Sequence, residues 1–539
     1  MCGIALISGT GADDGLFGQM LSALEPRGEI EATLREESLL AGVRRLKILD
    51  RERALQPWQS ADGRWLVCFN GEIFNYRQLR AELTGLGRQF RTESDTEVVA
   101  EAFAEWGERA TAKFRGEFAL AIAERATGRT YLARDPVGVK PLYWSCRNDQ
   151  LFVASEVKAL VPVGAAVSEV PPGQHGWAEA EGGAPVLAPY LDLMGIGADL
   201  PPVEDPAEAA KLLRLAVEDS IRVRVDTDLT VGVVLSGGLD SSVVLANVLQ
   251  MHPDCVALTV GAPGSDDLLY ARRLCGDLGV RHEVITVRPA DIRLSEIREA
   301  IRMSELTEYG DIINAVVSVP LFARARQLGI KVVLTGDGSD ELFGGYSMYE
   351  RIPEEASRQL FRHMISNLHR TELQRVDRVS MGNGVEARVP YLDPAVVELA
   401  MRLPVGLKVR DGQEKWIMRQ AFEGLLPEYV LRRPKNPMSH SSGLHERARL
   451  YRPLFAGLHR SFGYHLLDAV HRDFSVVLGR CGDDLDRAVA MTRTGQDYSP
   501  AEHARDLAGA LRWNAAAALR RRPRPAPRRP PGRHARAGR

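Results

Sequence analysis

An alternation of apolar strands and helices, which begins near residue 208, most constrains the fold of this chain. The expected strands are residues 229–235, 255–260, 282–287 and 330–336, and the expected helices around them are 208–224, 240–250 and 267–278. Strands that are apolar along their whole length are typical of a parallel sheet with helices on both faces. Ligands of such folds bind in the loops after the carboxyl ends of the strands. The second half of the chain is therefore predicted to be an α/β ligand-binding domain.

The first part of the chain has a different pattern, because its strands outnumber its helices. The expected strands are residues 2–8, 39–48, 65–69, 118–124, 129–134 and 151–155, and the expected helices are 76–87 and 94–107. Both helical segments have apolar residues at helical spacing and end at glycine. This pattern predicts antiparallel sheets covered by helices.

These patterns divide the chain into four parts. Residues 2–160 form the first predicted domain, and a Pro- and Gly-rich connector with short hairpins follows at 161–206. Residues 207–515 form the second predicted domain, which is mostly helical after residue 350. Residues 516–539 are rich in Arg and Pro and are predicted to be disordered.

Composition limits the setting and the partners of the protein. Its six cysteines have no CxxC spacing, which argues against a disulfide framework and a structural zinc site. Acidic residues soon interrupt the apolar run after Met1, and no 18 residues are uninterruptedly apolar, so neither a signal peptide nor a membrane span is expected. The last twenty residues hold nine arginines without interleaved aromatics, while the whole chain has a formal charge of −2, so its body is acidic and nucleic-acid binding is not expected. We expect a soluble cytoplasmic protein.

Two glycine-rich loops follow strands of the predicted parallel sheet. The first is "VLSGGLDSS" (234–242), in which Ser236, Ser241 and Ser242 offer hydroxyls and the following helix offers free N–H groups to an anion. The Gly-Lys-Ser/Thr of a Walker A loop is absent. A plain strand–helix turn is the alternative, but in this position the loop resembles the pyrophosphate loop of ATP pyrophosphatases.

The second loop is "LTGDGSDELFGGY" (334–346), and it adds a second carboxylate. We expect Asp240 and Asp340 to lie at neighbouring strand ends. Mg²⁺ usually takes one or two carboxylates together with phosphate oxygens. The pair therefore predicts a magnesium site, with a surface charge cluster as the alternative.

Cys2 follows the initiator methionine. Removal of Met1 would give Cys2 a free α-amine, whose ordinary pKa of about 7.7–8.0 makes it a base able to activate the thiol of its own residue. A small buried hydrophobe is the alternative. In "FNGEIFNY" (69–76), Asn70 and Gly71 supply donors for an oxyanion. Arg45 can bind a carboxylate with two hydrogen bonds and Asp95 can pair with an ammonium.

Together these motifs resemble a known family. "MCGI", "RRLKILD", "QPW", "NGEIFNY", "SDTEV", "RGEFALAI" and "ARDPVGVKPLYW" resemble a class II glutamine amidotransferase domain. With "SGGLDSS", "GAPGSDD", "TGDGSDELFGGY", "GVEARVPYLD" and "RRPKNP", the chain is similar to the glutamine-hydrolysing asparagine synthetases from residue 2 to about residue 445. The resemblance implies an N-terminal-nucleophile αββα sandwich, followed by a parallel-sheet ATP-pyrophosphatase domain with added helices.

The resemblance also implies roles for individual residues. Ammonia from glutamine would pass through an internal tunnel to a site where ATP adenylates aspartate. The implied catalytic residues are Cys2, Asn70, Gly71, Asp337 and Lys435, and the implied glutamine-binding residues are Arg45, Glu72 and Asp95. The implied ATP-binding residues are Val234, Ser236, Gly237, Gly238, Asp240, Ser241, Ser242, Val260 and Gly336, with Asp240 and Asp340 at Mg²⁺. Lys415 is a further basic candidate at pyrophosphate, or else a solvated helix lysine. Homodimers are usual in the family.

Three segments depart from the family pattern. The usual "HRGPD" reads "PRGEI" at 26–30, and Asp337 stands where the best-known members have glutamate. The stretch 308–320, which helps shape the acceptor site in relatives, is also altered. One alternative is therefore the same chemistry on another carboxylic acid. A second is an intramolecular amide synthetase, like β-lactam synthetase, with an inactive glutaminase domain, against which Cys2, Arg45, Asn70 and Asp95 argue. Two further alternatives are an RNA-modifying pyrophosphatase and a non-catalytic interaction protein. The presence of the residues of both implied active sites disfavours a non-catalytic protein.

Overall fold

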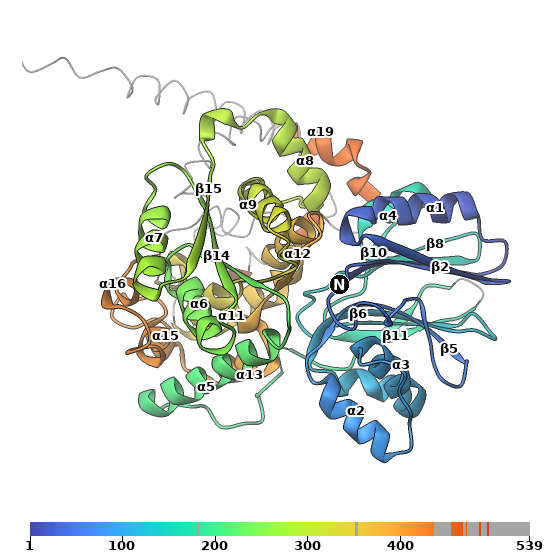
Figure 1. The fold of residues 1–539 in the computed structure, drawn as a ribbon, viewed down its shortest axis with the longest axis horizontal. Coiled ribbons are helices and arrows are strands. Elements are labelled where there is room, and N and C mark those ends of the chain that lie inside the picture. The colour runs from blue at the N-terminus through green and yellow to red at the C-terminus, as the bar shows by residue number, and fades with distance from the viewer. Residues whose placement is uncertain are drawn as a thin grey trace, which may run out of the picture.

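A computed structural model describes residues 1–180, 183–193, 195–350, 354–435 and 454–466, with short pieces at 470–471, 485–486 and 493–494. Two bodies lie side by side in Figure 1. We call residues 1–190 the N-terminal half and residues 206–466 the C-terminal half. The chain begins where the two halves meet (Figure 1).

The N-terminal half is a sandwich of two six-stranded antiparallel sheets, ordered β10-β8-β9-β1-β3-β2 and β12-β11-β7-β6-β5-β4. Its strands are β1 Cys2–Ser8, β2 Ile30–Glu36, β3 Leu39–Arg45, β4 Trp58–Gln59, β5 Trp65–Ile73, β6 Gly116–Glu124, β7 Thr130–Arg134, β8 Tyr143–Arg147, β9 Gln150–Ala154, β10 Ser168–Glu169, β11 Gln174–Ala178 and β12 Val186–Pro189. Alternate residues of β1 such as Ile4 and Leu6 pack against residues of β5 and β6 such as Leu66 and Ala121, which closes the sandwich.

Helices cover both outer faces of the sandwich. These are α1 Asp14–Ala23 and α4 Val157–Leu160 on the first sheet, and α2 Tyr76–Gly85 and α3 Asp95–Trp106 on the second. Phe17 and Met20 of α1 share a core with Ala5 and Ile7, which are the residues of β1 that face away from the sandwich interior. The αββα arrangement expected from the resemblance is therefore confirmed.

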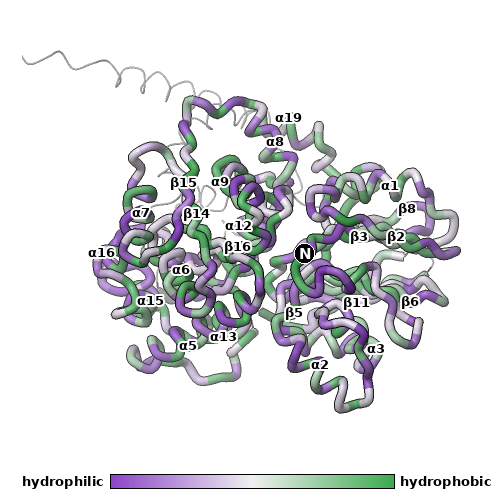
Figure 2. The backbone as a smooth tube through the Cα atoms, in the orientation of Figure 1, coloured by the Kyte–Doolittle hydropathy of each residue, from purple (hydrophilic) through white to green (hydrophobic). Residues whose placement is uncertain are grey.

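The C-terminal half contains a five-stranded sheet, ordered β15-β14-β13-β16-β17, in which every pairing is parallel. Its strands are β13 Val231–Val234, β14 Cys255–Gly261, β15 Arg281–Thr286, β16 Val332–Leu334 and β17 Glu386–Arg388. The strand order reverses between β13 and β16, so the loops after these two strands are neighbours at the edge where ligands bind in such sheets. Figure 2 shows hydrophobic residues along β14, inside this sheet.

Helices surround this sheet, as expected. They are α5 Pro206–Arg224, α6 Leu239–Met251, α7 Asp266–Leu278, α8 Leu294–Ser304, α9 Tyr309–Gln327, α10 Ser339–Phe343, α11 Glu354–Asn367, α12 Glu372–Met381, α13 Pro394–Arg402, α14 Val405–Lys408, α15 Trp416–Ala421, α16 Glu428–Leu431 and α19 Phe455–Ser461. No helix among the described residues is long and apolar enough to cross a membrane. The predicted tail at 516–539 and Cys481 lie outside the described residues.

Some elements were not predicted. The sequence patterns missed α1, β2, β8 and β17, and the passage at 161–206 contributes β10, β11 and β12 to the two sheets. Strand β2 (IEATLRE) alternates half-buried residues such as Ile30 and Leu34 with exposed polar ones, which is the pattern of a strand at the edge of a sheet. Strand β17 has only three residues, Glu-Ala-Arg, and its two charged side chains are buried.

Two candidate active sites

Cys2 is the first residue of β1 and is only 3% exposed. Its backbone N–H donates to Asn70 Oδ1 over 3.0 Å, and its carbonyl oxygen accepts a hydrogen bond from Arg27 Nε, also 3.0 Å. Burial raises the pKa of the Cys2 thiol, and the positive charges of the chain's amino terminus and Arg45 oppose this effect. Side chains from outside β1 therefore fix both backbone groups of Cys2.

The α-amino group of Met1 lies between the two halves. Its nitrogen is 3.3 Å from Glu386 Oε2 of β17, and both groups are buried. Removal of Met1 would transfer the α-amine to Cys2, whose nitrogen already has Asn70 Oδ1 as a partner. Asn70 would then orient an amine that is attached to the same residue as the thiol.

Asn70 and Gly71 lie in β5, where this strand pairs with β6. The Asn70 side chain is fully buried, and its Nδ2 has no hydrogen-bond partner among the described residues. A buried unpaired donor costs about 1–3 kcal/mol, so a ligand acceptor at this position would remove a real penalty. A Cβ on Gly71 would lie 2.2 Å from the Glu117 carbonyl oxygen, so only glycine permits the close pairing of these strands.

Gln56 is a residue of this site that the sequence analysis missed. Its Nε2 lies 3.6 Å from Cys2 Sγ, and its Oε1 accepts a hydrogen bond from the Phe69 N–H over 2.8 Å. The side chain is therefore anchored on β5 with its amide directed at the thiol. The only signal was its place in the "QPW" motif at 56–58.

Arg45 lies beside Cys2 in the register between β1 and β3. Its guanidinium donates to the carbonyl oxygens of Leu49, Asp50 and Arg51 over 2.9–3.1 Å. In this structure Arg45 thus holds the loop at 49–51, and it is 5% exposed.

The carboxylates of Glu72 and Asp95 are both buried near this site. Asp95 Oδ2 accepts a hydrogen bond from the Ile73 N–H, and Glu72 Oε2 lies 3.3 Å from Arg388 Nη2 of β17. Burial raises the pKa of Asp95 to about 6, and burial together with the neighbouring Asp95 raises that of Glu72 to about 8. Such carboxylates would gain from a cation between them.

The first glycine-rich loop connects β13 to α6. Gly237 has φ +68°, and a Cβ there would lie 2.6 Å from the Ala271 nitrogen, so the loop passes directly over α7. The hydroxyls of Ser236 and Ser241 are 3.2 Å apart, and the buried Ser242 Oγ has no partner among the described residues. Val234 and Val260 lie at the carboxyl ends of the adjacent strands β13 and β14.

The two expected acidic residues converge on one cation. Lys415 Nζ is 2.5 Å from Asp240 Oδ2 and 2.5 Å from Asp340 Oδ1, and Lys435 forms a second ion pair with Asp340. Burial alone would raise the pKa of Asp340, but the two ammonium groups lower it to about 2. A Cβ on Gly336 would lie 3.1 Å from Asp240 Cβ, so the two loops are in contact.

Arg433 is a second residue that the sequence analysis did not assign. Its Nη1 donates to the Ser236 carbonyl oxygen over 2.8 Å, and its guanidinium also pairs with Asp267 of α7. With Lys435 it lines a small pocket over the first glycine-rich loop. Its signal was the "RRPKNP" motif, of which residues 436 and 437 lie outside the described residues.

Comparison with known proteins decides the family. Residues 1–173 match a glutamine amidotransferase domain, and residues 212–360 and 353–463 match asparagine synthase. Asparagine synthetase B (glutamine-hydrolyzing) of Escherichia coli K12 is 34% identical over 423 residues, which are 74% of this chain and 74% of the relative. The chain belongs to the glutamine-hydrolysing asparagine synthetase family. Asparagine synthetase 1 of Bacillus subtilis is 29% identical over 79% of this chain and 84% of its own, and a probable asparagine synthetase of Schizosaccharomyces pombe is 33% identical over 74% and 76%.

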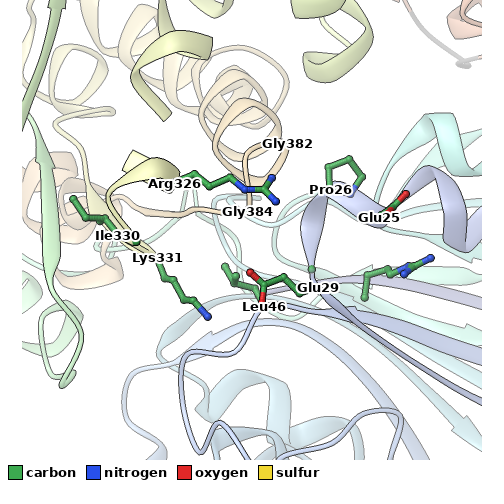
Figure 3. Close-up of a pocket in the computed structure, with 12 residues that line it drawn as sticks. Glu25, Pro26, Glu29, Leu46, Arg326, Ile330, Lys331, Gly382 and Gly384 are labelled. Atoms are coloured by element: carbon green, nitrogen blue, oxygen red, sulfur yellow. The ribbon is translucent and has the colours of Figure 1, made fainter. Parts of the chain in front are cut away.

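The segment that departs from the family pattern at 26–30 lines a cavity of about 510 Å³ between the halves. Figure 3 shows Arg326 and Lys331 of the C-terminal half on one side of it, and Pro26 and Glu29 on the other. Pro26, which stands for the family's histidine, is on the cavity wall, whereas Arg27 points inward and is fully buried. The arginine that the segment retains is therefore the residue that bonds to Cys2.

The other departure, Asp337, is not part of the cluster around Lys415. It lies three residues after the end of β16, and its Oδ1 is 2.7 Å from Arg375 Nη2 of α12. The altered stretch 308–320 lies at the start of α9, where Glu308 pairs with Arg370.

Proposed function

We propose that this chain is a glutamine-dependent asparagine synthetase. The observation that carries the proposal is the buried Cys2, held against an Asn70 amide whose Nδ2 has no partner among the described residues, in a chain that also presents a pyrophosphate-type loop. The relatives named as glutamine-hydrolysing asparagine synthetases support glutamine as the nitrogen donor and aspartate as the acceptor.

Glutamine hydrolysis would take place in the N-terminal half. The α-amine of Cys2 takes the proton of the thiol, and Sγ attacks the side-chain amide carbon of glutamine. Asn70 Nδ2 and the Gly71 N–H donate to the oxyanion that forms, and its collapse breaks the C–N bond, so ammonia leaves with the proton held by the α-amine and a γ-glutamyl thioester remains on Cys2. Water then hydrolyses this thioester, which releases glutamate and restores the thiol. Arg45 binds the α-carboxylate, while Glu72 and Asp95 bind the α-ammonium. Because that cation favours their charged forms, binding lowers the pKa values of both carboxyls from their raised positions.

Amide synthesis would take place at the edge of the parallel sheet. The β-carboxylate of aspartate attacks the α-phosphate of ATP, which gives aspartyl-AMP and pyrophosphate. Ser236, Gly237, Gly238, Ser241 and Ser242 hold pyrophosphate, and Lys435 stabilises the negative charge that gathers as the acyl-adenylate forms. Val234, Val260 and Gly336 border the adenine and AMP pocket, and Asp337 faces the reacting acyl group. Ammonia then displaces AMP and asparagine results.

Asp240 and Asp340 fit a Mg²⁺ ion, since both carboxylates already reach one cationic atom, Lys415 Nζ. The described residues contain no cluster of three or more metal-ligating side chains, so phosphate oxygens would complete the coordination. When bound, the metal would neutralise charge on the triphosphate. Lys415 would then turn from the carboxylates to pyrophosphate.

We also propose a cytoplasmic location and a homodimer. The five described cysteines are free thiols, as is usual in a reducing compartment. Light scattering of the purified chain measures the subunit number directly.

The test is a reaction with ATP, MgCl₂, aspartate and either glutamine or ammonium, with asparagine, glutamate and AMP quantified. Asparagine and AMP should appear in equal amounts with either nitrogen source. A Cys2→Ala chain should lose only the glutamine-dependent reaction. Glutamate release without asparagine would contradict aspartate as the acceptor, and loss of both reactions in Cys2→Ala would contradict two separate sites.

A further inference from the structure

Helix α12 lies between the two candidate sites and contacts both. Arg375 and Asp377 are two residues apart, so they project about 200° apart around the helix axis. One therefore faces the second glycine-rich loop and the other faces the N-terminal half. Neither residue was assigned a role by the sequence analysis.

Asp377 connects α12 to the nucleophile. Its Oδ2 and Oδ1 accept hydrogen bonds from Arg27 Nη1 and Nη2 over 2.8 and 3.2 Å. The same guanidinium donates through Nε to the Cys2 carbonyl oxygen. Both charged side chains are at most 1% exposed, so solvent does not screen this contact between the halves. Two hydrogen-bonded steps thus separate α12 from Cys2.

Arg375 connects α12 to the synthetase site. Its Nη2 is 2.7 Å from Asp337 Oδ1, in the loop that also carries Asp340. The side chain is 7% exposed, and its Nε has no hydrogen-bond partner among the described residues. Within the part of the chain that the structure describes, a donor thus lies unpaired beside the residue that we place near the acyl group.

The helix itself has little freedom to move between these contacts. Eight of its ten residues are buried. Arg378, next to Asp377, pairs with Glu305 at 3.0 Å and donates to Tyr143 Oη of the N-terminal half at 3.3 Å. A displacement of either end of the helix therefore moves the other.

We propose that α12 keeps the two reactions in step, with Asp377 and Arg375 as positioning residues that fix Cys2 and Asp337 relative to each other. This inference rests on the proposed function. When the contacts of α12 are lost, the N-terminal site hydrolyses glutamine even when no acyl-adenylate is present at the synthetase site. The ammonia is then released to solvent. The measure is the ratio of glutamate released to asparagine formed.

The experiment uses the full chain with saturating glutamine, ATP, MgCl₂ and aspartate. Asp377→Asn should raise the glutamate-to-asparagine ratio at least about threefold, within the range that substitutions along coupling elements produce. Its ammonium-supported synthesis should stay within about twofold of the parent, because the contacts of Arg375 with Asp337 and of Arg378 with Glu305 still hold the helix at the synthetase site. Asp393→Asn is the matched control, since Asp393 is equally buried and pairs across the halves with Arg115 but lies outside α12. Its ratio should not change.

A purely structural role for Asp377 predicts another result. Partial unfolding or local damage to the glutaminase site lowers the supply of ammonia without raising the ratio. The double variant Asp377→Asn/Arg375→Gln is the second readout. If both residues act through one helix, its ratio matches the larger single effect, because the connection is already broken.

An unchanged ratio in a folded Asp377→Asn chain, or single effects that multiply in the double variant, would overturn the inference. If Asp377→Asn does not fold, Asp377→Glu replaces it, since this change keeps the charge but displaces Arg27. The limits given for Asp377→Asn, on the glutamate-to-asparagine ratio and on ammonium-supported synthesis, apply to this variant as well. A parent chain that makes no asparagine from glutamine contradicts the proposed function instead, and the two failures are thus distinguishable.

Discussion

Asn70→Ala separates the catalytic from the structural role of one buried side chain. Asn70 Oδ1 accepts from the Cys2 N–H, while Nδ2 has no partner among the described residues. Loss of one oxyanion donor typically lowers kcat by about 10²–10³, or about 2.7–4 kcal/mol of transition-state stabilisation. We expect this loss in glutamine hydrolysis.

The expected effect on stability is much smaller. Loss of the Oδ1 acceptor leaves the buried Cys2 N–H unpaired and costs about 1–3 kcal/mol, but removal of the unpaired buried Nδ2 donor returns about the same amount. The small cavity that remains offsets part of this gain. The free energy of unfolding should therefore change by no more than about 2 kcal/mol.

Asn75→Ala is the matched control. Both amide groups of Asn75 are used, since Oδ1 accepts from the Arg115 N–H at 3.0 Å and Nδ2 donates to the Lys113 carbonyl at 2.9 Å. This change should destabilise the chain and leave the glutaminase kcat almost unchanged. The assays are glutamate release, ammonium-supported synthesis and urea denaturation. If Asn70→Ala keeps glutaminase activity within about tenfold while its stability collapses, Asn70 is structural and the oxyanion argument is wrong.

Three further predictions follow from particular contacts. Gly71→Ala forces a Cβ to within 2.2 Å of the Glu117 carbonyl, so it should lower the melting temperature and glutaminase activity, whereas Gly85→Ala, with nothing within 4 Å, should do neither. A chain that retains Met1 should lack glutaminase activity but still synthesise asparagine from ammonium. Mass spectrometry identifies the N-terminal residue, and both activities are then assayed on the same sample. Full glutamine use with Met1 present would refute the α-amine of Cys2 as the base. Because folding raises the pKa of Glu72 to about 8, ionisation of this carboxyl opposes folding, so the free energy of unfolding should fall as pH rises from about 4 through 8, and Glu72→Gln should flatten that part of the profile.

Local patterns were enough to predict most of the fold. Strands β1 and β14 and helices α6 and α7 lie within about one residue of the predicted ranges, because each has a clear apolar period and a glycine or polar boundary. The neighbouring loops after β13 and β16 were also predicted, since parallel strands end at a common edge. Strand β5 is longer than predicted, because Asn70, Gly71 and Glu72 continue it although their side chains are unusual for a strand.

The residues that the sequence did not reveal share one property. Arg27, Asp377, Glu386 and Arg388 are buried ions that each have a partner in the other half of the chain, besides partners in their own half such as Glu156 for Arg27 and Glu386 for Arg388. Polar residues of this kind normally indicate exposed positions, and only the fold shows which distant charge neutralises each. Motifs therefore predicted the residues that gather at the two candidate sites better than those that hold the halves together.

This distribution of buried ions has a consequence for the N-terminal site. Arg388 faces Glu72 and Asp377 faces Arg27, so two contacts of the proposed glutaminase site come from the C-terminal half and do not depend on Met1, whereas Glu386 faces the α-amino group of Met1 itself. A buried ion that loses its partner costs several kcal/mol. Expressed alone, the N-terminal half would expose Arg27 and Glu72 to water. Arg27, which bonds to the Cys2 carbonyl oxygen, would keep Glu156 but lose Asp377. The sandwich can retain its own core between the two sheets, but it should hydrolyse glutamine poorly, because the geometry of the nucleophile depends on contacts that the other half supplies.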